Sequence, residues 1–172
     1  MLIKRFSECI AMFLYLLLAG VAFLLLSPVC YVPGGCVGTP DVLWVSLSVL
    51  YILLLPLLCM VFGRYHAIGA YAALTLFFVL FLFAAIGAYT GVGENNDLIS
   101  YLFCFSLAPF APLIKSLCDT FSAVRMEFYV QLFLPIAVYA FSMTAYLVGH
   151  NSANRRALEQ YYEQMRVHET EE

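Results

Sequence analysis

Histidine is the side chain best suited to acid–base chemistry near neutral pH and to metal binding. The chain has three of them: His66, His150 and His168. Each lies at the edge of an apolar segment or in the charged C-terminal stretch, and none has an acid or cysteine at ligand spacing. No His-Glu-x-x-His motif, Walker loop or nucleophile elbow occurs. We therefore expect no catalytic residue, no metal site and no cofactor.

Cysteine is the next reactive residue type, and the chain has six. Cys9, Cys59 and Cys104 lie in apolar runs, which is typical of cysteines buried as small hydrophobic residues. Cys30 and Cys36 differ, because they flank a Pro-Gly-Gly turn in "CYVPGGC". In an oxidising compartment they could form a disulfide, and two free thiols are the alternative. A zinc site would need two further ligands.

Ionisable side chains inside apolar segments mark proton relays and transport pathways, and here they are almost absent. Glu8 stands at the start of the first apolar segment, close to two basic residues, where an interfacial ion pair is the simpler interpretation. The last apolar segment has only Gln131, Ser142 and Thr144 as polar sites. This pattern argues against a proton-coupled transporter and against most membrane enzymes.

The C-terminal tail, 150–172, carries the most specific pattern. Leu158, Tyr161, Tyr162 and Met165 recur at helical spacing and share one face. Charged residues decorate the rest of this expected helix: Arg155, Arg156, Glu159, Glu163 and Arg166. The spacing predicts a short amphipathic helix that ends in acidic residues.

Two interpretations of the tail stay open. It could be a docking helix for a soluble partner or a neighbouring subunit, anchored by Tyr161 and Tyr162 and flanked by Arg155 and Arg156. It could also be a solvated helix that continues the preceding span. Either Asn151 or Ser152 could cap its N-terminus. The bases are too few for strong binding to anionic lipid.

The composition decides which kind of protein must position these residues. Hydrophobic residues make up 64% of the 172 residues and charged residues only 11%, whereas a soluble domain carries about 25% charged residues. A water-soluble fold of this length could not bury so much apolar surface. We expect an all-α polytopic membrane protein. There is no basic patch that would suggest nucleic acid binding.

Four apolar segments each have the roughly 20 residues that a bilayer core requires. They cover residues 7–27, 42–63, 67–90 and 128–148. The first follows Lys4 and Arg5 but is longer than the apolar core of a signal peptide, so we expect it to be a retained span. Residues 1–149 would then form a transmembrane bundle, followed by the tail.

A fifth apolar segment, 98–114, is ambiguous. A helix over it reaches roughly 26 Å, the lower limit for a span. Pro109 and Pro112 interrupt it, since each removes a backbone donor and disfavours helix at the preceding residue. An apolar stripe at helical spacing follows, so 113–148 could be one long helix. We expect 98–114 to be re-entrant or interfacial, which makes Pro109 and Pro112 a turning point between four full spans.

The positions of Lys and Arg set the expected orientation. Lys4, Arg5 and Arg64 lie on one side, and the loops 28–41 and 91–97 on the other carry no base. With four spans, six of the eight basic residues lie on the N-terminal side, against five with five spans. We therefore expect a cytoplasmic N-terminus and a cytosolic tail, in a bacterial inner membrane.

Small residues four apart recur in the third segment, and such spacing lets helices approach closely. The pairs are Gly69 and Ala73, Ala84 and Ala88, and Gly87 and Gly91. They could serve packing inside the bundle or the interface of a homo-oligomer.

Together these features predict a non-enzymatic membrane subunit that oligomerises and couples the bilayer to a soluble partner through its tail. Membrane sensor components of bacterial defence and stress modules share this plan, an analogy of architecture alone. The alternative is a small oligomeric channel lined by the re-entrant segment and by Gln131, Ser142 and Thr144. A membrane enzyme lacks candidate catalytic residues.

Overall fold

Four long apolar helices dominate the computed structural model, which describes residues 2–32, 35–89, 97–120 and 127–171. The helices are α1 (Leu2–Leu26), α2 (Val42–Arg64), α3 (Ile68–Tyr89) and α6 (Glu127–Glu171). Each is long and apolar enough to cross a membrane. This confirms the predicted helical architecture with four helices of span length.

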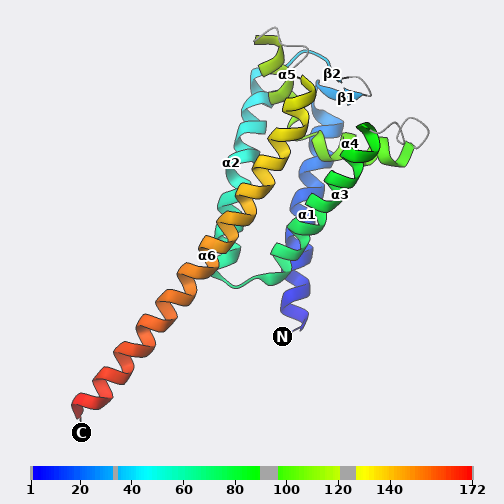
Figure 1. Ribbon diagram of the computed structural model, residues 1–172. Coiled ribbons are helices and arrows are strands. Elements are labelled where there is room, and N and C mark those ends of the chain that lie inside the picture. The colour runs from blue at the N-terminus through cyan, green and yellow to red at the C-terminus, as the bar shows by residue number, and fades with distance from the viewer. Residues whose placement is uncertain (1, 33–34, 90–96, 121–126, 172) are drawn as a thin grey trace.

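The four helices pack in two pairs, α2 with α6 and α1 with α3 (Figure 1). The N-terminus and the C-terminus lie toward the same end of the bundle, and α6 projects far beyond its neighbours there (Figure 1). A helix of 45 residues is about 68 Å long, more than twice the thickness of a bilayer core of about 30 Å. The tail is therefore the continuation of the last span.

The predicted start of a separate tail helix at Asn151 or Ser152 is wrong. Both residues lie inside α6, where the Ser152 hydroxyl donates a hydrogen bond to the carbonyl oxygen of Gly149 at 2.8 Å. A serine hydroxyl bonded to its own helix leaves the backbone ladder intact. The bundle and the tail consequently share one continuous backbone.

The proline-containing segment forms two helices, α4 (Asp97–Leu107) and α5 (Ala111–Thr120), which meet at a bend of 74°. Pro109 lies in the bend and Pro112 in the first turn of α5, where a proline costs no hydrogen bond. Four side chains at the bend have no exposed surface: Leu107, Phe110, Ala111 and Ile114. The irregular backbone is thus packed against protein, as membrane depth requires.

The predicted long helix over 113–148 is wrong, because α5 packs beside α6 as well as against α2 and is not its straight continuation. Residues 121–126, over which the apolar stripe continues, lie outside the described part of the chain. Periodicity alone could not reveal this contact between α5 and α6.

A short hairpin closes the end of the bundle opposite the termini (Figure 1). Its strands are β1 (Cys30–Val32) and β2 (Gly35–Val37), which pair antiparallel. Cys36 stands opposite Tyr31, and Cys30 stands opposite Val37. The Cys30 side chain lies outside the described residues, so the predicted disulfide stays a prediction.

Two glycines let α2 and α6 touch backbone to backbone. A Cβ atom on Gly63 would overlap the carbonyl oxygen of Tyr146, and one on Gly149 would overlap the carbonyl oxygen of Met60. Each glycine thus faces the main chain of the other helix, which cannot move aside as a side chain can. The contact fixes where the two helices cross, next to the end of α2.

We expect Gly63→Ala to destabilise the full chain in mild detergent by about 1–3 kcal/mol, the usual cost of overpacking. Alanine favours a helix by up to about 1 kcal/mol relative to glycine, so the net loss measures the forced separation of α2 and α6. Gly20→Ala is the matched control, because its new Cβ would meet only the outer ring atoms of Phe105. A midpoint of thermal unfolding for Gly63→Ala at or above that of Gly20→Ala would contradict this packing.

Candidate functional site

The point where α6 leaves the bundle joins two histidines that are 84 residues apart in the sequence. The Nδ1 atoms of His66 and His150 lie 2.9 Å apart, and their rings stand nearly perpendicular with centroids 4.6 Å apart. One imidazole must donate and the other accept, because each ring nitrogen can play only one role at a time. We call Gly63, His66, Gly149 and His150 the exit clamp.

The local backbone explains how His66 reaches α6. The chain leaves α2 with His66 at φ 54°, and hydrogen bonds run from His66 N to Gly63 O and from Ala67 N to Phe62 O. These two bonds make a Schellman motif, in which glycine is the usual residue at the left-handed position. A histidine there costs roughly 1–2 kcal/mol of backbone strain, which the bond to His150 helps to offset.

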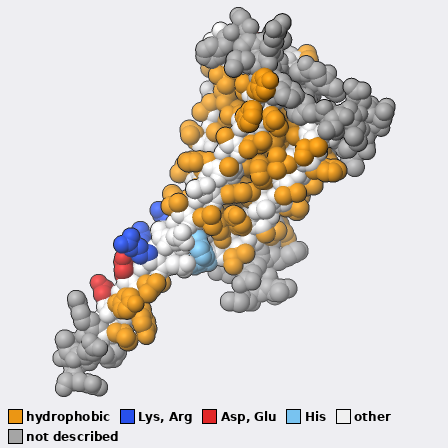
Figure 2. Space-filling model, viewed as in Figure 1, with side chains coloured by type: hydrophobic (Ala, Val, Ile, Leu, Met, Phe, Trp, Pro, Cys, Tyr) orange, Lys and Arg blue, Asp and Glu red, His pale blue; other side chains and the backbone are white. Residues whose placement is uncertain are grey.

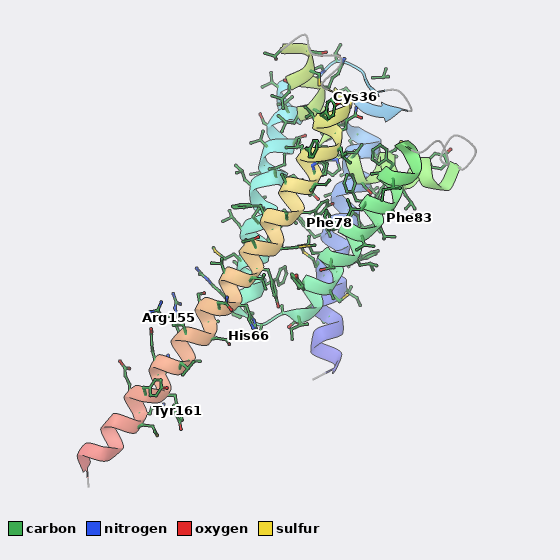
Figure 3. The ribbon with its side chains drawn as sticks, viewed as in Figure 1. Cys36, His66, Phe78, Phe83, Arg155 and Tyr161 are labelled. Atoms are coloured by element: carbon green, nitrogen blue, oxygen red, sulfur yellow. The ribbon has the colours of Figure 1, made fainter. Side chains whose placement is uncertain are left out.

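Aromatic rings extend the exit clamp toward α3. Tyr146 stacks on His150, one turn away on α6, with centroids 6.2 Å apart. Tyr71 of α3 packs against Tyr146 with centroids 4.9 Å apart. Figure 3 shows His66 beside α6, with Arg155 and then Tyr161 further along the projecting helix. The rings therefore connect three helices at the base of the tail.

Two buried polar atoms accompany these rings. The Tyr146 hydroxyl and the Oε2 atom of Glu8 are buried, and neither has a hydrogen-bond partner in the described part of the chain. Glu8 lies on α1, close enough to act electrostatically on Tyr146. Each unpaired buried group costs about 1–3 kcal/mol, so the environment of the exit clamp is polar and less completely satisfied than the rest of the core.

The interaction available at the exit clamp is a hydrogen bond between two imidazole rings. Among the described residues, no group of three or more histidine, cysteine or acidic side chains could hold a metal ion. Sequence reasoning missed the pair because neither histidine has a partner nearby in the sequence. The signal that could have found it is topological, since both histidines follow predicted spans that end at the same end of the bundle.

The tail carries its apolar side chains into open space. Leu158, Tyr161, Tyr162 and Met165 are 52%, 56%, 62% and 47% exposed. Figure 2 shows them as a hydrophobic patch on the projecting helix, separated from the bundle by polar and charged atoms. The structure places the predicted docking residues together and leaves them uncovered.

The charged residues of the tail lie beside this patch. Arg155 Nε is 3.3 Å from a carboxylate oxygen of Glu159, one turn along the same helix, and Arg156 is exposed next to it. Both members of the ion pair are largely exposed, so the pair contributes little stability. The exposed charges give this part of α6 a polar surface beside the apolar patch.

The predicted small-residue face of α3 lies inside the bundle. Gly69, Ala73, Ala84 and Gly87 are all buried, on a helix that packs mainly against α1. Ala88 and Gly91 lie outside the residues whose side chains the structure describes. The described residues of this face are buried by packing within one chain.

The polar residues of the last span do not converge on one surface. Ser142 is fully buried and donates to the carbonyl oxygen of Val138, while Thr144 is exposed and donates to that of Ala140. Gln131 is buried.

In comparisons with protein-family models, curated proteins and solved structures, nothing matches this chain.

Removal of the bond between the two histidines should destabilise the full chain in mild detergent. We expect His150→Phe to lower the free energy of unfolding by about 1 kcal/mol, because phenylalanine keeps the ring on Tyr146 and removes the hydrogen bond to His66.

His168→Gln is the control, since His168 lies in the tail away from the exit clamp, and it should leave the free energy of unfolding unchanged. An equal free energy of unfolding for the natural chain and for His150→Phe would show that the His66–His150 bond does not stabilise the fold.

Proposed function

We propose that this protein is a non-enzymatic integral membrane subunit that oligomerises and couples the membrane to a soluble partner through its tail. The observation that carries the proposal is the unbroken helix α6, which takes an exposed apolar face out of the bundle. A bare apolar face of this kind on a soluble segment is typical of interaction sites. Tyrosines are frequent anchors at such sites.

The exit clamp supports a role in signalling. The crossing at Gly63 and Gly149, together with the His66–His150 bond, fixes the direction in which α6 leaves the bundle. Because one helix is rigid across this point, a rearrangement of α2 against α6 would displace the tail. Coupling of this kind needs an element that has two arrangements, and both the membrane end and the tail end must be able to favour one of them. The pair of histidines, joined by one shared proton, is suited to be that element.

In the proposed topology, α1, α2, α3 and α6 span the bilayer, and the bent pair α4–α5 is re-entrant from the side opposite the termini. Burial of the bend and its 74° angle favour a packed insertion over a straight fifth span. The N-terminus and the tail then both lie in the cytosol, with more basic residues on that side. We place the protein in a bacterial inner membrane.

The same plan fits the membrane sensor of a bacterial defence or stress module, in which a small multispan protein controls a cytosolic effector. The channel alternative has no specific support in the described residues, since the hydroxyls of Ser142 and Thr144 bond to their own helix.

Labelling of single introduced cysteines from each side of the membrane tests the topology. We expect Gln160→Cys to react with an impermeant maleimide only from the side of the N-terminus, and Thr120→Cys only from the opposite side. The natural chain, with its own six cysteines, gives the background. Labelling of Gln160→Cys only from the side opposite the N-terminus would overturn the four-span topology and the cytosolic partner with it.

Removal of residues 153–172 should abolish co-purification of the soluble partner from source membranes, because the docking face is lost. Tyr162→Ala should lower recovery of the same protein at least tenfold, as expected for an anchor worth about 2 kcal/mol. Val148→Ala is the matched control, since Val148 is an exposed apolar residue of α6 close to the bundle. A partner retained after the deletion would remove the basis of the proposal.

A further inference from the structure

Exposed side chains along the tail recur with the period of a coiled coil. Asn151, Asn154, Leu158, Tyr161 and Met165 are all exposed, and they are alternately three and four residues apart. This spacing averages 3.5 residues per turn, the period of a left-handed coiled coil. An isolated helix of this length is marginal in water, so the stripe predicts a helical partner.

The same repeat continues without a break into the bundle. Phe133, Ala137, Ala140, Thr144 and Leu147 are likewise exposed and keep the alternation of four and three residues. We call the ten positions from Phe133 to Met165 the α6 seam. A soluble partner could cover only the tail half of the seam, whereas a partner that covers all of it must itself lie in the membrane.

We propose that the α6 seam binds the α6 seam of a second copy of this chain, as a parallel two-helix coiled coil that runs from the membrane into the cytosol. Copies inserted in one membrane have the same orientation and depth, so each layer of the seam meets its own counterpart. In the heptad that the spacing defines, Leu158 and Met165 take the a position and Tyr161 takes the d position. Asn151 also takes an a position, where a single asparagine specifies register and oligomeric state.

The charges of the tail agree with this pairing. Arg156, Glu159 and Glu163 lie at positions away from the seam, where parallel pairing keeps them in water. Arg155 flanks the seam and is already bonded to Glu159 of its own helix. The other flanking positions between Asn154 and Met165 hold Ala157, Tyr162 and Gln164, which are uncharged, so no pair of like charges would oppose association.

This inference rests on the proposed function, and it assigns different parts of the tail surface to two binding partners. Leu158, Tyr161 and Met165 serve the second copy, whereas Tyr162 and the arginine pair beside it remain for the soluble partner. Gly149 of the exit clamp lies on the side of α6 opposite the seam, against α2. Two α6 helices joined along the seam, each with its direction fixed by its own exit clamp, would therefore offer the soluble partner a pair of tails in one fixed orientation.

Cysteine crosslinking of the full chain in its membrane tests the seam. We expect Asn154→Cys and Tyr161→Cys to give a crosslinked dimer on mild oxidation at least tenfold more efficiently than Arg156→Cys and Gln160→Cys, which lie off the seam. The natural chain gives the background from its own cysteines. Leu158→Asp, combined with Asn154→Cys, should abolish the crosslink by placing two carboxylates in one layer.

Other results would overturn the pairing. Equal crosslinking on and off the seam, no crosslinking anywhere, which is expected if lipid and water alone cover it, or crosslinks to a different protein would each do so. If the crosslink fails while Tyr162-dependent capture of a soluble partner persists, the pairing is wrong and the proposed function stands. If the dimer forms while deletion of 153–172 leaves partner capture unchanged, the pairing stands and the proposed function is wrong.

Discussion

The contact between Gly63 and Gly149 is the constraint on which the functional end of the molecule depends. Because each glycine faces the backbone of the other helix, α2 and α6 approach as closely as two main chains can. Small residues at such crossings are how membrane helices gain packing energy where no hydrophobic force drives them together. The close approach brings the turn after α2 onto α6, and the His66–His150 bond follows from it.

Histidine at position 66 is the second consequence. The Schellman turn after α2 would accept glycine without strain, and at φ 54° a histidine is held only at a cost. The ring nitrogen of His66 reaches across to His150 from there. A strained residue, a hydrogen bond between two histidines and an incompletely satisfied Tyr146 thus meet at one helix crossing.

The sequence predicted what depends on local composition and periodicity. The four long apolar helices and the apolar face of the tail followed from apolar length and helical spacing. What it missed depends on contacts between distant segments: Gly63 against Gly149, and His66 against His150. The separate tail helix was also wrong, because Asn151 and Ser152 can cap a helix locally but here lie in one that tertiary packing had already begun.

The continuity of α6 ties these points together. A helix that ended at the membrane surface would leave its last carbonyl groups without partners, and a new helix beyond it would turn freely. By running on past Gly149, α6 satisfies those groups and also passes its direction, fixed by the exit clamp, to residues about 20 Å further along the axis. Leu158, Tyr161 and Met165 are therefore held at a set distance and angle from the bundle, which is the geometry that the proposed pairing of two α6 helices requires.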